Sequence, residues 1–133
     1  TKAGAASALR GLGCVALDKG DIDQARTLIQ ESFRLFHTLA FRIDIVKCLG
    51  ILASIAIAQR QPVTATTLLG AAESVRQAIG ISLPMVEHAR YERDRETLCA
   101  QLNVETFNAA WDKGYGMTFE QVIAYALGEK HPK

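Results

Sequence analysis

The densest group of acidic residues, the stretch LDKGDIDQARTL at 17–28, is the first place where metal chemistry could occur. A calcium loop of the EF-hand type needs oxygen ligands at its first, third and fifth positions, glycine at the sixth and glutamate at the twelfth. A loop starting at Asp18 would have Gly20 third and Ile22 fifth, and one starting at Asp21 would have alanine fifth. The spacing therefore favours a turn in which the glycine ends one helix and Asp21 caps the next.

Catalysis by a nucleophile or a metal would need cysteine and histidine side chains in a recognisable pattern. The cysteines are too few for a disulfide framework and too far apart for a Cys-x-x-Cys pair. No Gly-x-Ser-x-Gly, Walker or His-Glu-x-x-His motif occurs. The residues concerned are Cys14, Cys48, Cys99, His37, His88 and His131. We predict a protein without catalytic activity, metal or cofactor, and an enzyme assembled from these residues is the least favoured alternative.

The bulk composition argues against several classes of partner. The chain has 133 residues, enough for one domain, and 49% of them are apolar. Its 15 basic and 14 acidic side chains leave no excess charge for nucleic acid or a membrane surface. The longest uncharged apolar stretch, 48–59, is shorter than the roughly 20 residues that span a bilayer. We expect a cytoplasmic location and, because the first residue is Thr1 rather than Met, a fragment of a longer protein.

The elements that must position any site are helices. Alanine and leucine are abundant, proline is rare and no stretch alternates between apolar and polar residues, so about seven helices are predicted. The segment from about Ile22 is apolar on one face. The segment at 42–60 is apolar on nearly every side, which is typical of a central helix covered by its neighbours. Thr118 with Gln121 predicts a capping box at the last helix.

Three other segments could contact a ligand, but each has a plainer interpretation. The charged stretch at 87–96 could be a docking face, although interleaved charges favour a solvated helix. Trp111 fits a core anchor better than a ring that stacks on a ligand. The segment at 117–127 has one acidic and no basic residue, so it is predicted to be a closing helix rather than a DNA-recognition helix.

Residues 12–33 match residues 52–73 without gaps, which indicates an internal repeat in which Leu12 corresponds to Leu52 and Ala25 to Ala65. Gly13, Ala16 and Ala25 are small, and their positions would let the two helices of one hairpin approach closely. A bulkier residue there would cost about 1–3 kcal/mol through overpacking.

This set of small residues after Leu12 resembles the tetratricopeptide repeat, although the period is longer than is usual for that family. The segments 68–84, 91–98 and 107–127 follow in an order that resembles the C-terminal repeat region of multidomain bacterial ATPase-type and LuxR-type transcriptional regulators. The resemblance covers 9–127 and implies an all-α, right-handed array of helical hairpins. The expected units are repeat one at about 5–40, repeat two at about 42–80, a degenerate third hairpin at about 84–114 and a closing helix at about 118–128.

In such an array the first helix of each hairpin lines the concave face. The inward positions predicted from the repeat, as candidates for partner binding, are Ser7, Arg10, Cys14, Leu17, Asp18, Lys47, Ser54 and Ile57, with Gly50 and Ala58 beside them. Arg10 and Lys47 could hold a carboxylate. For any single position, contact with the next repeat or with solvent is the slightly favoured interpretation.

The function expected from the resemblance is a non-catalytic protein-interaction or regulatory module of a larger bacterial signalling or transcription regulator. The alternative is a small-ligand sensing domain of such a regulator. The expected partner is a protein or peptide, including other domains of the same chain, with no direct contact to nucleic acid or membrane. An exposed face at the end of the repeats could also join two copies in a homodimer.

Overall fold

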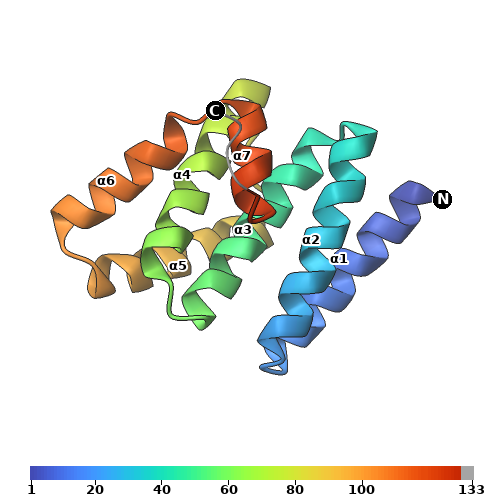
Figure 1. Cartoon of the computed structure of the whole chain (residues 1–133), viewed down its shortest axis with the longest axis horizontal. Coiled ribbons are helices and arrows are strands. Elements are labelled where there is room, and N and C mark those ends of the chain that lie inside the picture. Colours follow the sequence, from blue (N-terminus) through green and yellow to red (C-terminus); the bar gives the residue numbers. More distant parts are fainter. Residues whose placement is uncertain (130–133) are drawn as a thin grey trace.

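The computed structural model describes residues 1–129, and this part of the chain contains helices and no strand (Figure 1). His131 lies outside the described residues. In chain order the helices are α1 (Lys2–Asp18), α2 (Ile22–Leu39), α3 (Arg42–Ala58), α4 (Pro62–Ile79), α5 (Met85–Gln101), α6 (Val104–Tyr115) and α7 (Phe119–Ala126). None of the helices in residues 1–129 has both the length and the apolar composition that a membrane crossing requires.

Side-chain caps fix the start of several helices. The Asn103 side chain accepts a hydrogen bond from Thr106 N (2.8 Å) at the start of α6. Thr118 and Gln121 form the predicted capping box of α7. Asp21 occupies the N-cap position of α2, but its side chain makes no capping hydrogen bond, so that part of the prediction is wrong. Its carboxylate can still interact favourably with the positive end of the helix.

The first four helices form two equivalent hairpins. The sequence repeat aligns Leu12 with Leu52. With this alignment, α3 begins and ends at the residues that correspond to the ends of α1, and α4 begins and ends at those that correspond to the ends of α2. The connecting turns match as well, because Gly20 and Arg60 both have positive φ (81° and 61°), and so do Ala40 and Gly80 (59° and 80°). The two hairpins are therefore equivalent in local structure as well as in sequence.

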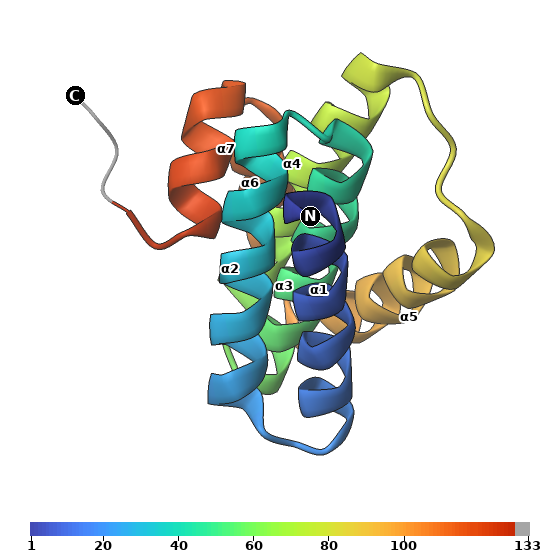
Figure 2. The ribbon, with the colours of Figure 1, turned by 90° about the vertical axis from the view of Figure 1, so that its right-hand side faces the viewer.

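The core lies where these hairpins meet. In α3 nine residues are buried, and the helix packs on α2, α4 and α5, as its apolar composition predicted. Within the first hairpin, a Cβ on Gly13 would lie 2.7 Å from Ile29 Cγ1, so glycine is what allows α1 and α2 to approach this closely. α1 lies at one end of the molecule, and no other helix of residues 1–129 covers its outer side (Figure 2).

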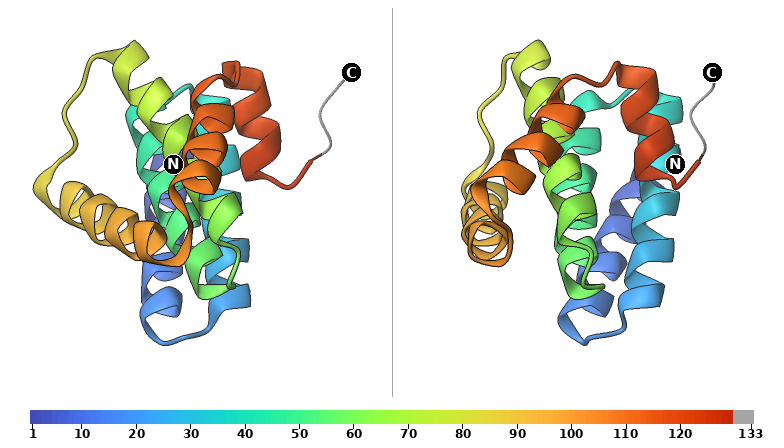
Figure 3. Two further views of the ribbon diagram at one scale, coloured as in Figure 1. Left: turned by 90° about the vertical axis from the view of Figure 1, so that its left-hand side faces the viewer. Right: turned by 60° about the vertical axis from the view of Figure 1, so that its left-hand side comes forward.

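The C-terminal part departs from the repeat. The segment expected as a third hairpin, 84–114, does contain two helices, but α6 packs along α4 rather than along α5 (Figure 3). Gly70 and Gly114 make this possible, because a Cβ on Gly114 would overlap the Thr67 carbonyl oxygen and one on Gly70 the Trp111 carbonyl oxygen. With the place beside α4 taken by α6, α5 extends away from the stack.

The last helix closes the structure over the second helices of the two hairpins. The Phe119 ring lies 6.0 Å from the His37 ring, and the Arg42 guanidinium lies 4.5 Å from its centroid. Gln30 Nε2 on α2 donates to the Ala126 carbonyl oxygen (3.2 Å). Val122, Ile123 and Ala126 of α7 belong to the buried core, so this helix covers apolar surface as the sequence predicted for a closing helix.

Candidate binding cleft

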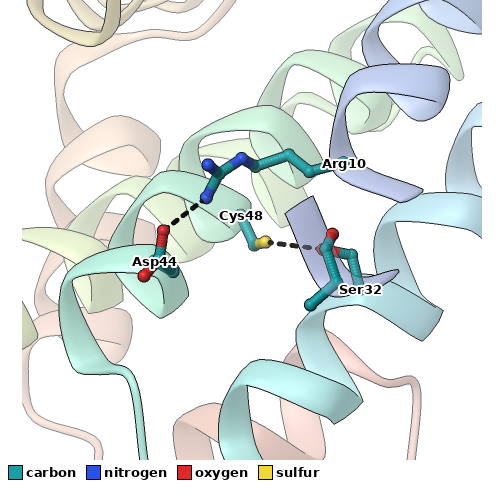
Figure 4. Close-up of polar contacts among 5 residues, drawn as sticks. Arg10, Ser32, Asp44 and Cys48 are labelled. Atoms are coloured by element: carbon teal, nitrogen blue, oxygen red, sulfur yellow. Dashed lines mark hydrogen bonds and ion pairs between the residues drawn. The ribbon is translucent and has the colours of Figure 1, made fainter. Parts of the chain in front are cut away.

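The predicted inward residue Arg10 is engaged in the fold. Its guanidinium forms an ion pair with Asp44 (2.7 Å; Figure 4). It also lies 5.1 Å from the Phe36 ring centroid. These contacts join α1 to α2 and α3. The side chain is therefore a contact between repeats, and the carboxylate that its guanidinium holds in this structure is that of Asp44.

The other first-repeat positions are divided between the core and the surface. Cys14 and Leu17 are half-buried and pack against the core, while Ser7 and Asp18 are exposed. In the second repeat Ile57 also packs against the core. None of these five side chains lines the cleft that is described below.

Ser54 contacts a buried carboxyl group that the sequence did not indicate. Its Oγ donates to Asp94 Oδ2 on α5 (2.5 Å) and lies 3.3 Å from the Gly50 carbonyl oxygen. Asp94 is 7% exposed, so the solvated interpretation of the charged stretch at 87–96 does not hold for this residue. Burial raises the pKa of the Asp94 carboxyl, while the bond from Ser54 and the charges of Arg93 and Arg90 lower it.

Two of the predicted inward residues, Lys47 and Gly50, line a cleft with a volume of about 410 Å³. The cleft lies between α3, α4, α5 and the connection at 80–84. Its apolar lining includes Val46, Leu69 and Leu83. Its polar lining includes Glu87, His88, Arg90, Tyr91 and Glu92, all from the same side of the cleft on α5.

The cleft has a structural origin in the incomplete third repeat. In the first interface between hairpins, α2 packs on α3 through Ser32, whose Oγ lies 3.8 Å from Cys48 Sγ, and the buried Phe36 stacks on Phe41 (6.3 Å). The α4 residues that correspond to Ser32 and Phe36 in the repeat are Ala72 and Arg76, and both line the cleft. The cleft is therefore the part of a helix-packing surface that α5 leaves uncovered.

One wall of the cleft is held by Arg76. Its Nε donates to Glu73 Oε1 (2.6 Å) and its NH1 donates to the Ile81 carbonyl oxygen (2.5 Å). Lys47, by contrast, takes part in no ion pair among residues 1–129. This leaves Lys47 as a positive charge on the α3 wall that a bound group could use.

Gly50 keeps the cleft open. A Cβ built at this position meets no atom within 4 Å, unlike one built at Gly13, Gly70 or Gly114. Glycine inside a helix costs about 1 kcal/mol relative to alanine. Since packing within the chain does not require glycine at position 50, its effect is to leave room beside α3.

The aromatic residues near the cleft form a connected group. Tyr91 lies edge-on to Trp111 (6.3 Å), and Trp111 stacks on Phe107 (6.1 Å). Burial is the main cause that raises the pKa of Tyr91, followed by the nearby charge of Glu73. Trp111 is half-buried against the core, which agrees with its interpretation as an anchor.

The cleft lining gives no catalytic arrangement of cysteine and histidine. His88 lines it, but no cysteine does. Burial raises the pKa of the Cys48 thiol to about 11, so that this cysteine stays protonated beside Ser32 (Figure 4). Within residues 1–129, no group of three or more histidine, cysteine or acidic side chains is placed to hold a metal ion.

Most of the cleft lining was not identified from the sequence. Lys47 and Gly50 followed from the repeat, whereas His88, Tyr91 and Arg76 depend on how far α5 tilts from α4. The signal that could have found them is the repeat itself, because Ala72 and Arg76 correspond to residues that pack on the next helix.

Comparison with protein-family models, curated proteins and solved structures finds no match to this chain.

Proposed function

We propose that this chain is a non-catalytic, tetratricopeptide-like binding module of a larger bacterial signalling or transcription regulator, and that the cleft binds a segment of a protein partner. The observation that carries the proposal is that the α4 wall of the cleft is a helix-packing surface left uncovered. Such a surface suits the apolar side chains of a peptide or helix. Lys47, on the opposite wall, would add a contact for a carboxylate of that segment.

The charges of the cleft also suit a polypeptide. Glu87 and Glu92 stand with Arg90 along α5, so both signs are available within one helix. Such mixed charges would orient a segment without requiring a highly charged ligand. The bacterial regulator as the parent protein is inferred from the order of sequence motifs alone.

Sensing of a small molecule is the second candidate, and the size of the cleft favours it. A volume of about 410 Å³ falls in the range of pockets for small ligands, about 300–1,000 Å³. Such pockets combine apolar side chains with convergent polar groups, and both kinds line this cleft. The two candidates differ in the ligand and share the site.

The test is a substitution that fills the cleft with a large side chain from the α3 wall. Gly50→Phe would occupy the space beside Lys47 without displacing a neighbouring atom at its Cβ. Gln24→Phe, at an exposed position on α2, is the matched control. One probe is a set of peptides that are selected for binding to the unmodified domain from a displayed random-peptide library. The other is a library of small-molecule fragments, whose binding is detected by NMR.

We expect the selected peptides to bind the unmodified domain and Gln24→Phe equally, and Gly50→Phe at least about tenfold more weakly, a difference of about 1.4 kcal/mol. Their binding should shift the amide resonances of Gly50 and Tyr91. Equal binding by Gly50→Phe would place the peptides elsewhere and overturn the proposal. Cleft resonances that respond to fragments alone would establish the small-ligand candidate instead.

A further inference from the structure

The outer face of α1 is an exposed apolar surface that no part of residues 1–129 covers. We define this face by five residues without charge or polar side chains: Ala5, Ala8, Gly11, Leu12 and Val15. All five are exposed, with Leu12 at 57% and Val15 at 49%. Their spacing places them along one side of the helix. Figure 2 shows α1 in front of the other helices at its end of the molecule.

The internal repeat shows what this kind of face does elsewhere in the molecule. The corresponding α3 residues are Ile45, Cys48, Ile51, Leu52 and Ile55, and each is at most 5% exposed. Cys48 Sγ lies 3.8 Å from Ser32 Oγ, which identifies α2 as the helix packed on this side. The same positions are thus buried by a preceding helix in α3 and uncovered in α1.

We propose that the outer face of α1 is a docking surface for a further hairpin of the same repeat, which packs its second helix on α1 as α2 packs on α3. The partner's contact face is apolar and uncharged, with a small polar residue at its centre, like Ser32. This surface is separate from the cleft and does not depend on the function proposed for it.

The sizes of the residues specify the fit more closely. Ala5 and Gly11 stand where α3 has Ile45 and Ile51, so the surface of α1 is flatter than its counterpart. A Cβ on Gly11 meets no atom within 4 Å, which means that nothing inside the chain requires glycine there. The docked helix must therefore supply the larger side chains, as α2 does with Phe36, which is buried and stacks on Phe41 (6.3 Å).

The repeat itself provides a probe of the right chemistry. A second copy of segment 1–40 is fused to the N-terminus of the complete chain, so that a second copy of α2 precedes α1. Thr1 of the original chain then takes the position that Phe41 occupies before α3, and the natural register is kept. Unfolding in urea and the molecular mass in solution are measured for the extended and the original chains.

We expect the extended chain to be monomeric and to unfold in one transition, with a midpoint about 1 M urea above that of the original chain. In the extended chain, Leu12→Lys in the copy of α1 that belongs to the original chain should abolish this rise in the midpoint. In the original chain the same change should leave the midpoint nearly unchanged, because Leu12 is exposed there.

Two results would overturn the proposal. In the first, the added hairpin unfolds in a separate transition and leaves the midpoint of the rest unaltered. In the second, the original chain forms a concentration-dependent dimer that Leu12→Lys dissociates, which would assign the face to a second copy. Neither result affects the cleft, so the two proposals fail independently.

Discussion

At the scale of single residues, the glycines inside the helices of this chain have different surroundings, and a side chain would have a different effect at each of them. Gly13 faces a flexible Ile29 side chain, whereas Gly70 and Gly114 face backbone atoms of a crossing helix. Gly50 faces open space in the cleft. Identical residues in the sequence therefore carry opposite consequences for stability, and the surroundings determine the sign.

Alanine at two of these positions should show opposite effects. Gly114→Ala should lower the free energy of unfolding by about 3 kcal/mol, because the new Cβ meets the Thr67 carbonyl oxygen and lies 2.9 Å from Ala71 N, neither of which can rotate away. Gly50→Ala should raise it by about 1 kcal/mol, since it removes the helix cost of glycine without a clash. Urea denaturation measures both, with Gly13→Leu expected to destabilise by crowding Ile29. A destabilised Gly50→Ala would contradict the interpretation of this glycine.

The buried carboxyl of Asp94 predicts a dependence of stability on pH. Its pKa is raised from 3.8 in the folded state, mainly by burial, so the folded protein binds this proton more tightly than the unfolded chain. The stabilising contribution of Asp94 to the free energy of unfolding is therefore complete below pH 3.8, and it is lost as the pH rises through the folded-state pKa. A protonated Asp94 can donate to Ser54 Oγ, which frees the hydroxyl proton for the Gly50 carbonyl oxygen.

Asp94→Asn removes this titration and keeps a polar partner for Ser54. The free energy of unfolding of the variant, relative to the unmodified chain, should increase between about pH 4 and about pH 7. Ser54→Ala is the companion variant, and it should enlarge the total loss in the chain that retains Asp94, because the bond from Ser54 lowers the pKa of this carboxyl. Thermal unfolding across the pH series measures the difference. A constant difference over this range would mean that Asp94 is ionised at all of these pH values in the folded state.

At the scale of the elements, the four turns of the two hairpins show how alike the repeats are. Gly20 and Arg60 hold equivalent left-handed positions, and only one of them is glycine. A residue with a Cβ costs roughly 1–2 kcal/mol in this conformation. The second hairpin thus contains a strained turn that the first avoids.

Exchanging the residues at these positions tests this equivalence. Arg60→Gly should raise the free energy of unfolding by about 1 kcal/mol, and Gly20→Arg should lower it by a similar amount. Both residues are exposed, so lost packing does not enter. Thermal melting of the two variants and of the double exchange, which should be nearly neutral, provides the measurement. Melting temperatures that move in the same direction would contradict the assigned turn geometry.

The elements were also where the sequence was most informative. The helices of residues 1–129, the central position of α3 and the capping box at Thr118 were all expected from apolar periodicity and cap residues. The arrangement of α5 was not expected, because its charged stretch looked fully solvated. The packing of α5 on α3 and α4 places part of α5 along the cleft and buries Asp94 beside Ser54.

At the scale of the whole molecule, the two candidate surfaces follow from the two ends of the repeat pattern. At one end, α1 presents a face that its counterpart α3 buries. At the other end, α4 leaves uncovered a surface that corresponds to the surface of α2 on which α3 packs. The regular part of the structure is thus two hairpins long, and the surfaces proposed for binding are the places where regular packing stops.

The sequence by itself determined the helices, their approximate boundaries and the register of the repeat, because apolar spacing, small residues and turn residues act over distances of one or two helical turns. Only the tertiary structure decided that Arg10 joins the repeats, that Asp94 is buried, and that Lys47 and Gly50 face a cleft. The Arg10 contact depends on how α1, α2 and α3 pack together. The other two outcomes depend on how closely α6 can approach α4 at Gly70 and Gly114, and hence on the direction left for α5. Contacts between residues this far apart are set by the packing of whole helices, which local sequence patterns do not specify.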